Sequence, residues 1–428
     1  MSNNKSNVLA IAIMFFLFAM ISFVTGLQNP FALVVKEQFG ATNLMSQLGN
    51  AANFIAYALI GLPAGFILSK KGYKFTALLA VAVGFVGVGI TYLSGVAESF
   101  GVYLLGAFVS GFSMCMLNTV VNPMLNTLGG GGNKGNQLIQ WGGSLNSLFA
   151  TICPVFVGVL ISKVGEGAKA TISDVNPALF LAMGIFALAF IVIFFSEIPE
   201  PGLAAATASK EEKSEGTMDT IKGALSYKHF VFGIIAIFLY VGVEVGIPNF
   251  FNLYMTSPAV GISKAVAGTI VGMYWFLMLC GRLTGAAIGG KVSSRAMMIT
   301  VTSVAVVLVG LGMVLGDSVM VKFPAITPDL TFSLQEIPIG VMFFVLCGLC
   351  TSVMWGAIFN LAVEGLGKYT SIASGLFMVM VCGGGILPLV QGWVADATGN
   401  FLTSYLVIIL AVCYMLWFAL YGSKVKKA

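Results

Sequence analysis

Residues 26–31 read GLQNPF and residues 246–251 read GIPNFF, which repeats the first glycine, the asparagine and the last phenylalanine 220 positions later. The same shift continues through the next apolar segment and pairs Lys71 with Lys291. One register that holds over so long a stretch indicates two copies of one unit in tandem. Many membrane transporters are built from such internal repeats, with the binding site between them at the membrane midplane.

The composition around this repeat requires a lipid environment. Hydrophobic residues make up 58% of the 428 residues and charged residues 9%, whereas a soluble domain carries about 25% charged residues. A membrane-spanning helix takes about 20 apolar residues, and the alternating segments of a β-barrel are absent. We therefore predict an all-α membrane protein with twelve transmembrane helices, at residues 8–33, 47–69, 76–95, 100–128, 138–162, 177–197, 229–256, 264–289, 296–316, 338–366, 370–392 and 401–422.

A hydrophilic stretch divides these spans six and six. Residues 199–228 gather charged and small residues, among them the run SKEEK at residues 209–213. We predict an N-terminal six-helix bundle at residues 1–198, a cytoplasmic linker at 199–228 and a C-terminal six-helix bundle at 229–428. Two parallel six-helix repeats are the architecture of the major facilitator fold.

The basic residues predict the orientation in the membrane. If both termini are cytoplasmic, the inner segments hold fifteen lysines and arginines and the outer loops hold five. Helical membrane proteins carry an excess of lysine and arginine in their cytoplasmic loops. We therefore expect a multi-pass protein of the bacterial inner (cytoplasmic) membrane, with both termini cytoplasmic and a long outer loop at residues 317–337. The net charge of +5 follows from this bias and indicates no nucleic-acid partner.

The sequence lacks the motifs of catalysis and metal binding. All seven cysteines fall inside apolar spans, and Cys347 and Cys350 have no partner ligands for a metal. The four glycines at residues 129–132 lack the Gly-Lys-Ser/Thr ending of a phosphate-binding loop, and no zinc-protease or serine-hydrolase motif occurs. We expect no enzymatic activity, no metal and no cofactor.

Four stretches carry a family resemblance. Residues 65–74 read GFILSKKGYK and are similar to the loop motif G-x-L-a-D-(R/K)-x-G-(R/K)-(R/K), with Ser69 in place of the aspartate. Residues 117–123 read LNTVVNP and are similar to the signature L-E-T-A-x-N-P. Residues 240–245 and 383–392 are also similar to stretches of the same family. Over nearly its whole length the chain resembles the major facilitator superfamily, specifically its fucose–glucose–galactose–H⁺ symporter branch, to which the fucose permeases belong.

The resemblance implies sugar transport, with one difference from the family pattern. The family has an acidic residue near the end of helix 1 and another in helix 4, which are linked to proton coupling and sugar recognition. These positions correspond to Asn29 and Asn118 here. An amide can donate a hydrogen bond to a sugar hydroxyl and accept one from it, but it cannot bind and release a proton. The resemblance therefore implies a polar site without the usual coupling groups of the N-terminal half.

Polar and aromatic side chains inside the spans are the candidate substrate site. A polar side chain in lipid is costly and tends to face the interior of the bundle, and amides with aromatic rings suit the hydroxyls and C–H faces of a hexose. The alternative is polar contact between helices, which we favour for Asn122 and Asn360. Gln140 falls at a position that the family uses for sugar contact. The predicted substrate-binding residues are Gln28, Asn29, Asn118, Asn122, Gln140, Trp141, Asn249, Asn252, Trp275, Trp355, Asn360 and Gln391.

Two charges within spans are candidates for coupling or gating. Glu244 lies in an apolar turn of the seventh predicted helix, and Arg282 lies towards the cytoplasmic end of the eighth. Glu244 could carry a proton, bind sodium or pair with Arg282. The alternative for both residues is a structural ion pair inside the C-terminal bundle.

These patterns together predict a monomeric secondary transporter in the lipid bilayer. Its expected activity is import of a monosaccharide (fucose, glucose, galactose or an N-acetylhexosamine) by alternating access. Coupling to H⁺ or Na⁺ through Glu244 is one option, and uncoupled uniport is another. The same fold could instead export a drug or another small metabolite. A membrane sensor is a third hypothesis, which we disfavour because the sequence shows no sizeable soluble output domain.

Overall fold

A computed structural model of the chain describes residues 2–128, 132–162, 164, 169–200, 217–288, 292–326, 331–366 and 369–425. Long helices dominate the described residues. The main elements are α1 (Ser2–Gly26), α2 (Gln28–Phe39), α3 (Asn43–Ser46), α4 (Leu48–Val96), α5 (Phe100–Leu128), α6 (Gly132–Ser162), α7 (Asn176–Phe195), α9 (Thr217–Leu225), α10 (Lys228–Met255), α11 (Lys264–Ile288), α12 (Ser294–Leu315), β1 (Met320–Ile326), β2 (Phe332–Pro338), α13 (Ile339–Thr351), α14 (Met354–Val363), α15 (Thr370–Val379), α16 (Gly383–Thr398) and α17 (Phe401–Trp417).

The predicted all-α membrane fold is confirmed. Within the described part of the chain, ten helical segments are long and apolar enough to span a membrane, and α13 with α14 forms an eleventh span bent by 42°. The first limb of α4, residues 48–71, supplies the twelfth segment. The helices are therefore those that the apolar runs predicted, with small differences at their ends.

The second and third spans are joined more tightly than expected. The sequence predicted a loop at residues 70–75, whereas α4 is helical for 49 residues apart from a kink at Gly72. Gly72 has φ 84° and ψ 177°, a backbone conformation that glycine adopts without steric cost. The carboxylate of Glu200 accepts hydrogen bonds from the amides of Tyr73 (2.6 Å) and Lys74 (2.9 Å). These bonds satisfy free donors at the start of the second limb.

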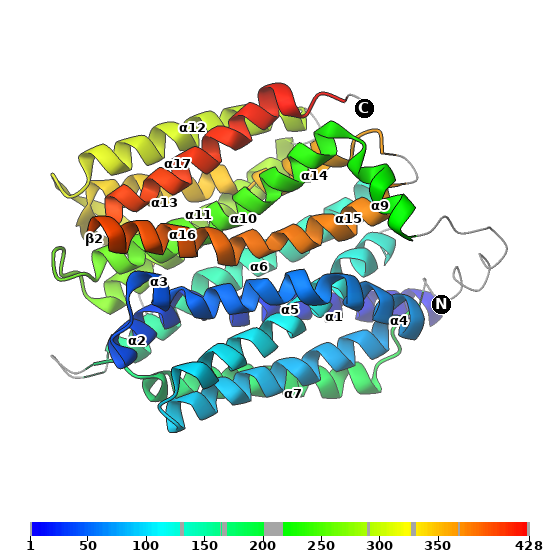
Figure 1. The fold of residues 1–428 in the computed structure, drawn as a ribbon. Coiled ribbons are helices and arrows are strands. Elements are labelled where there is room, and N and C mark those ends of the chain that lie inside the picture. Colours follow the sequence, from blue (N-terminus) through cyan, green and yellow to red (C-terminus); the bar gives the residue numbers. More distant parts are fainter. Residues whose placement is uncertain are drawn as a thin grey trace.

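The helices lie side by side along one axis, with both termini at the same end (Figure 1). We call this end the terminal end, and we call the opposite end, where α2 and α3 lie, the far end. Helices α1–α7 form the N-terminal half and α10–α17 the C-terminal half. The two halves contact each other mainly along α6 with α11 and along α4 with α15 and α16.

Two segments predicted between spans contain secondary structure of their own. The predicted linker at residues 199–228 contains the helix α9, which packs against α15. The predicted outer loop at residues 317–337 contains an antiparallel hairpin, in which β1 pairs with β2. The pattern of apolar runs did not reveal either element, because both are shorter than a membrane span.

Glycines let α6 and α11 approach closely near the far end. A Cβ on Gly268 of α11 would lie 2.7 Å from the carbonyl oxygen of Pro154 and 3.2 Å from Cα of Gly158, both on α6. One turn further on, a Cβ on Gly272 would lie 2.8 Å from the carbonyl oxygen of Thr151. The two halves therefore meet backbone to backbone at Gly268, while Gly272 also packs against the side chain of Val155, and neither glycine has room for a side chain.

We predict that Gly268→Val lowers the melting temperature of the purified protein. The branched side chain would push α6 away from α11, and overpacking of this kind costs about 1–3 kcal/mol. Gly184→Val on α7 is the matched control, because a Cβ at Gly184 meets no atom within 4 Å. Equal melting temperatures for the two variants would contradict the close contact between the halves.

Candidate functional site

An asparagine pair on α5 offers hydrogen-bonding groups from the N-terminal half. The Asn118 side chain donates from Nδ2 to the hydroxyl of Tyr57 on α4 (3.2 Å) and to the carbonyl oxygen of Met114 (3.0 Å). Asn122 donates from Nδ2 to the carbonyl oxygen of Asn118 (2.9 Å). Both asparagines are half-buried. Because both Nδ2 hydrogens of Asn118 are engaged, this residue presents its Oδ1 as an acceptor.

Aromatic rings from the C-terminal half form a cluster around Trp355 on α14. The centroid of its ring lies 6.2 Å from that of Tyr240 on α10 and 5.6 Å from that of Phe377 on α15, both edge-on. Phe359 contacts Phe377 at 5.1 Å. Trp275, another predicted contact residue, lies instead against Tyr274 on α11, with centroids 5.3 Å apart.

The asparagine pair and the aromatic cluster adjoin one contact between the halves. A Cβ on Gly61, one turn beyond Tyr57 on α4, would lie 3.6 Å from the side chain of Val379 on α15. Val379 follows Phe377 of the aromatic cluster by two residues. The amide acceptor of the N-terminal half is therefore bonded to α4 and the aromatic cluster of the C-terminal half includes α15, and these two helices contact each other across the halves.

Arg282 on α11 joins three helices. Its Nη1 donates to the carbonyl oxygen of Gly143 and to Oγ of Ser147 on α6, at 2.9 Å each, and its Nη2 donates to the carboxylate of Glu244 on α10 at 3.4 Å. The side chains of Arg282 and Glu244 are 17% and 13% exposed. Glu244 and Arg282 are thus an ion pair, and the arginine also holds the N-terminal half through α6.

Amides at the start of α4, Gln47 just before its first residue and Asn50 in its first turn, close the interface between Arg282 and the far end. Gln47 accepts a hydrogen bond through Oε1 from Nδ2 of Asn249 on α10 (2.8 Å), and Asn50 donates to the carbonyl oxygen of Gly384 on α16 (2.7 Å). Asn249 and Asn252, two predicted substrate contacts, are 2% exposed. In this conformation the Asn249 amide is therefore occupied by the opposite half of the protein.

Charged groups complete the closure at the far end itself. Lys264 at the start of α11 donates to the carboxylate of Glu37 on α2 at 2.7 Å. Asp396 near the end of α16 accepts hydrogen bonds from the amides of Asn43 (3.0 Å) and Leu44 (2.8 Å). Both contacts cross between the halves, so the structure is closed at its far end.

The remaining predicted residues lie apart from this central arrangement or outside the described residues. Gln391 on α16 is fully buried against Gly246 of α10. Asn360 is exposed and donates to Oγ of Ser294 within its own half (3.4 Å). Trp141 is 58% exposed. The side chains of Gln28, Asn29 and Gln140 are outside the described residues.

Sequence reasoning missed a polar stripe that begins at Gln47, the residue before α4, and continues along the first limb of α4. Gln47, Asn50, Asn53 and Tyr57 follow one another at intervals of three, three and four residues, which places them along one face of the helix. Asn53 donates to the carbonyl oxygen of Ala107 on α5 (3.2 Å), so the stripe serves both the N-terminal half and the contact between halves. The sequence signal that could have revealed this stripe is the helical spacing of its polar residues inside a predicted span.

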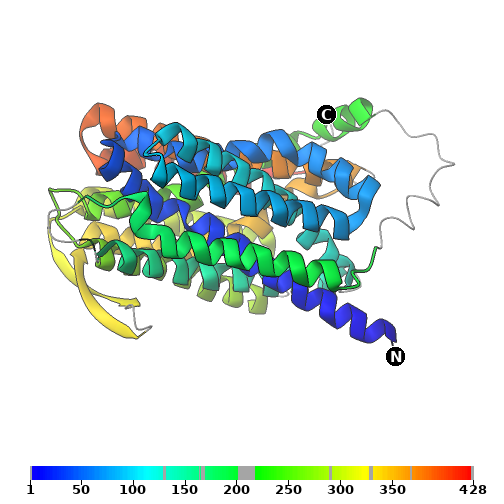
Figure 2. The same cartoon turned by 90° about the horizontal axis from the view of Figure 1, so that it is seen from below.

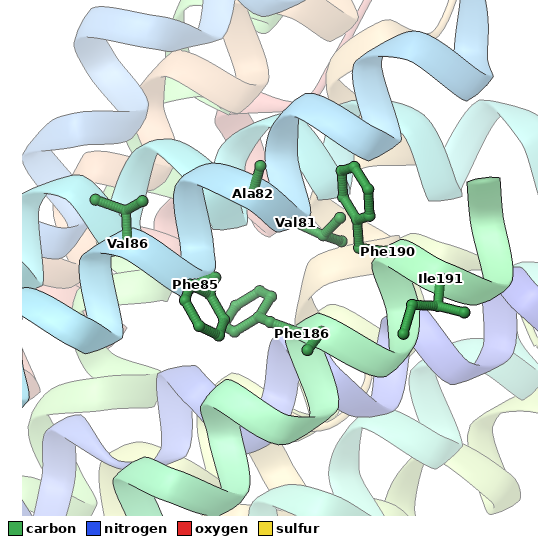
Figure 3. A pocket seen from close by; sticks show the side chains of 8 residues that line it. Val81, Ala82, Phe85, Val86, Phe186, Phe190 and Ile191 are labelled. Carbon is green, nitrogen blue, oxygen red and sulfur yellow. The ribbon is translucent and has the colours of Figure 1, made fainter.

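A separate groove lies between the second limb of α4 and α7 (Figure 3). It has a volume of about 390 Å³ and is lined by Val81, Ala82, Phe85, Val86, Phe186, Ala187, Phe190 and Ile191. Every one of these side chains is apolar, and five of the eight residues are exposed. A groove of this kind suits lipid rather than a polar solute.

A bundle of membrane-spanning helices in two halves, with polar and charged side chains between them, is the design of a secondary transporter. The Major Facilitator Superfamily profile matches residues 14–388. The chain belongs to the Major Facilitator Superfamily, and its relatives are transporters rather than enzymes.

Similar proteins extend over nearly the whole chain. The glucose/galactose transporter of Brucella abortus (strain 2308) is 29% identical, and the match covers 99% of this chain and 96% of that protein. The L-fucose-proton symporter of Escherichia coli (strain K12) is 21% identical over 98% of this chain and 94% of its own length. Among solved structures, the fucose:proton symporter FucP matches with a TM-score of 0.70 and 19% identity, over 97% of this chain and 99% of that one.

We predict that Glu37→Gln makes the far end open more often. An ion pair with this degree of exposure contributes at most about 1 kcal/mol, so the open fraction should rise up to roughly fivefold. The reporter is Ala51→Cys in a Cys413→Ser background, because Ala51 is buried where α4 meets Gly385 of α16. The rate of maleimide labelling in lipid nanodiscs measures the opening.

Glu98→Gln removes an exposed carboxylate of the same end and is the control. Labelling of Ala51→Cys that is equally fast in both variants would mean that the Glu37–Lys264 pair does not hold the far end closed.

Proposed function

We propose that the chain imports an uncharged monosaccharide, with fucose, glucose, galactose and an N-acetylhexosamine as the candidates. The observations that carry this proposal are the Asn118 acceptor, bonded to α4 in one half, and the aromatic cluster of Trp355 and Phe377 in the other half, where α15 contacts α4. Amide groups match the hydroxyls of a hexose, and aromatic rings match its C–H faces. The relatives named as glucose/galactose transporters and as fucose-proton symporters support the same substrate class.

The charges at the centre favour a neutral solute. Glu244 and Arg282 lie 3.4 Å apart and offset one another. Among the described residues of this region, a cationic drug or an anionic metabolite would meet no opposite charge that is not already paired. This observation favours a sugar over the alternative of a charged drug or metabolite.

We propose that the terminal end faces the cytoplasm, in a bacterial inner membrane. The fifteen-to-five distribution of basic residues supports this orientation. In this proposal the contacts of Glu37, Lys264 and Asp396 close the outer side of a monomeric alternating-access transporter. Opening of the far end would require these contacts to break while the terminal ends of the halves come together.

Coupling, in this proposal, depends on the C-terminal half. Asn118 stands at the family's acidic position in helix 4 and cannot carry a proton. Glu244 is the carboxylate next to the centre, and it holds Arg282, which bonds to α6. Binding of H⁺ or Na⁺ to Glu244 would weaken its attraction for the guanidinium and so alter the contact between the halves. This sequence of events would link ion binding to the change of access.

The test is uptake of a radiolabelled monosaccharide panel into proteoliposomes, with and without imposed H⁺ or Na⁺ gradients. We expect one sugar to be concentrated by one of the gradients. Glu244→Gln should abolish concentration of that sugar while leaving its exchange across the membrane, because only the coupling group is lost. Glu364→Gln, which changes an exposed carboxylate, is the control and should behave as the wild type.

The outcomes of that experiment separate the alternatives. Uptake that equilibrates without regard to either gradient would indicate a uniporter. If a protein that is stable in the vesicles takes up none of the sugars, the proposal that its substrate is a monosaccharide is wrong.

We predict that Tyr57→Phe weakens sugar affinity without unfolding the protein. The hydroxyl of Tyr57 orients the Asn118 amide, and a hydrogen bond of this kind contributes about 0.5–1.5 kcal/mol, or roughly two- to tenfold in affinity. The Michaelis constant of uptake is the measurement, with Tyr92→Phe on the second limb of α4 as the control. An unchanged Michaelis constant would mean that Asn118 does not contribute to sugar binding.

A further inference from the structure

The hairpin between α12 and α13 folds back along the bundle. Its base is tied to the start of α13, where the Ile339 amide donates to the carbonyl oxygen of Val319 (2.9 Å). Near its other end, the ring of Phe332 lies 5.6 Å from that of Phe276 on α11. Figure 2 shows the hairpin alongside the far-end part of the helices, on the outside of the bundle.

The position of Phe276 gives the depth that the hairpin reaches. Phe276 lies twelve residues after Lys264, the first residue of α11, which corresponds to about 18 Å along the helix axis. The hydrocarbon core of a bilayer is about 30 Å thick, and α11 has 25 residues. Phe276 is therefore well inside the membrane, and the end of the hairpin at Phe332 lies at a similar depth.

The two faces of the hairpin differ. Phe323 and Ala325 of β1 and Ile337 of β2 are buried, and the strands contact α11 and α13. Phe332 and Leu334 of β2 are 60% and 65% exposed. One face of the hairpin thus belongs to the protein core, while large apolar side chains project from the other.

The polarity of the outer face changes along the strands. The pair at the base of this face is Met320 with Pro338, and the next pair is Lys322 with Glu336, whose side chains are both exposed. Pro324 with Leu334 follows on this face, and then Ile326 with Phe332, of which Ile326 is buried and Phe332 exposed. A charged pair at the membrane surface and apolar pairs below it are the order that a bilayer leaflet would favour.

We propose that this hairpin is immersed in the far-end leaflet of the bilayer, with lipid acyl chains against Leu334 and Phe332 and lipid headgroups beside Lys322 and Glu336. Open strand edges are costly in hydrocarbon. Here α11 and α13 cover part of the hairpin, Pro324 has no backbone donor to leave unpaired, and the charged base lies where water and headgroups can bond to the backbone. The hairpin so anchors the C-terminal half, through α11 and α13, in one leaflet.

The test places a fluorophore at two positions on the same face of β2. Leu334→Cys and Glu336→Cys, each in a Cys413→Ser background, are labelled with an environment-sensitive dye and placed in phosphatidylcholine–phosphatidylglycerol nanodiscs. Quenching by nitroxide-labelled lipid and quenching by aqueous iodide are compared. Nanodiscs expose both membrane faces, so access of iodide does not depend on orientation.

The proposal expects opposite responses at the two positions. The dye at residue 334 should be quenched at least severalfold more by the lipid nitroxide than the dye at residue 336, and iodide should show the reverse order. Iodide quenching at residue 334 as strong as at residue 336 would overturn the proposal, because the hairpin would then lie in water. Protection from both quenchers would overturn it in favour of contact with a second protein copy. Neither result depends on whether the chain transports a sugar.

Discussion

The guanidinium of Arg282 is the interaction on which the centre of the structure depends. Removing a charge from water costs several kcal/mol unless partners replace the lost solvation. Glu244, the carbonyl oxygen of Gly143 and the hydroxyl of Ser147 supply those partners, and they come from α10 and α6. One group that must stay paired therefore constrains three helices and both halves. Any movement of α6 against α11 has to offer Arg282 new partners.

The contact between α6 and α11 links this centre to the far end. It continues from Ser147 through Thr151 and Gly272 to the backbone contact of Gly158 with Gly268. On the other side of the interface, the α4 amides and Asp396 make corresponding contacts with α10, α16 and α3. Rigid helices transmit a change at one end of such an interface to the other end. In our proposal this is how a change at Glu244 reaches the far-end closure.

The sequence predicted the spans well because lipid imposes a simple rule on length and polarity. It could not show which amides face the solute, because that depends on packing between segments far apart in the chain. Asn249 illustrates the limit: its partner, Gln47, lies about 200 residues away and on the other half. The hairpin was missed for a related reason, since its mixture of Lys322, Glu336 and apolar residues reads as a loop until its contact with α11 is known. By contrast, Glu244 and Arg282 were recognisable as candidates because charges inside spans are rare.

The most direct measurement of the central claim is a pair of spin-label distances in the same preparation. One pair, Met45→Cys with Ala397→Cys, spans the halves at the far end, and the other, Lys70→Cys with Glu364→Cys, spans them at the terminal end; all four positions are exposed. The account predicts that a transported hexose lengthens the far-end distance in a fraction of molecules and shortens the terminal-end distance in a matching fraction. Distances that stay unchanged with every hexose tested, or that lengthen at both ends together, would contradict alternating access around a central sugar site.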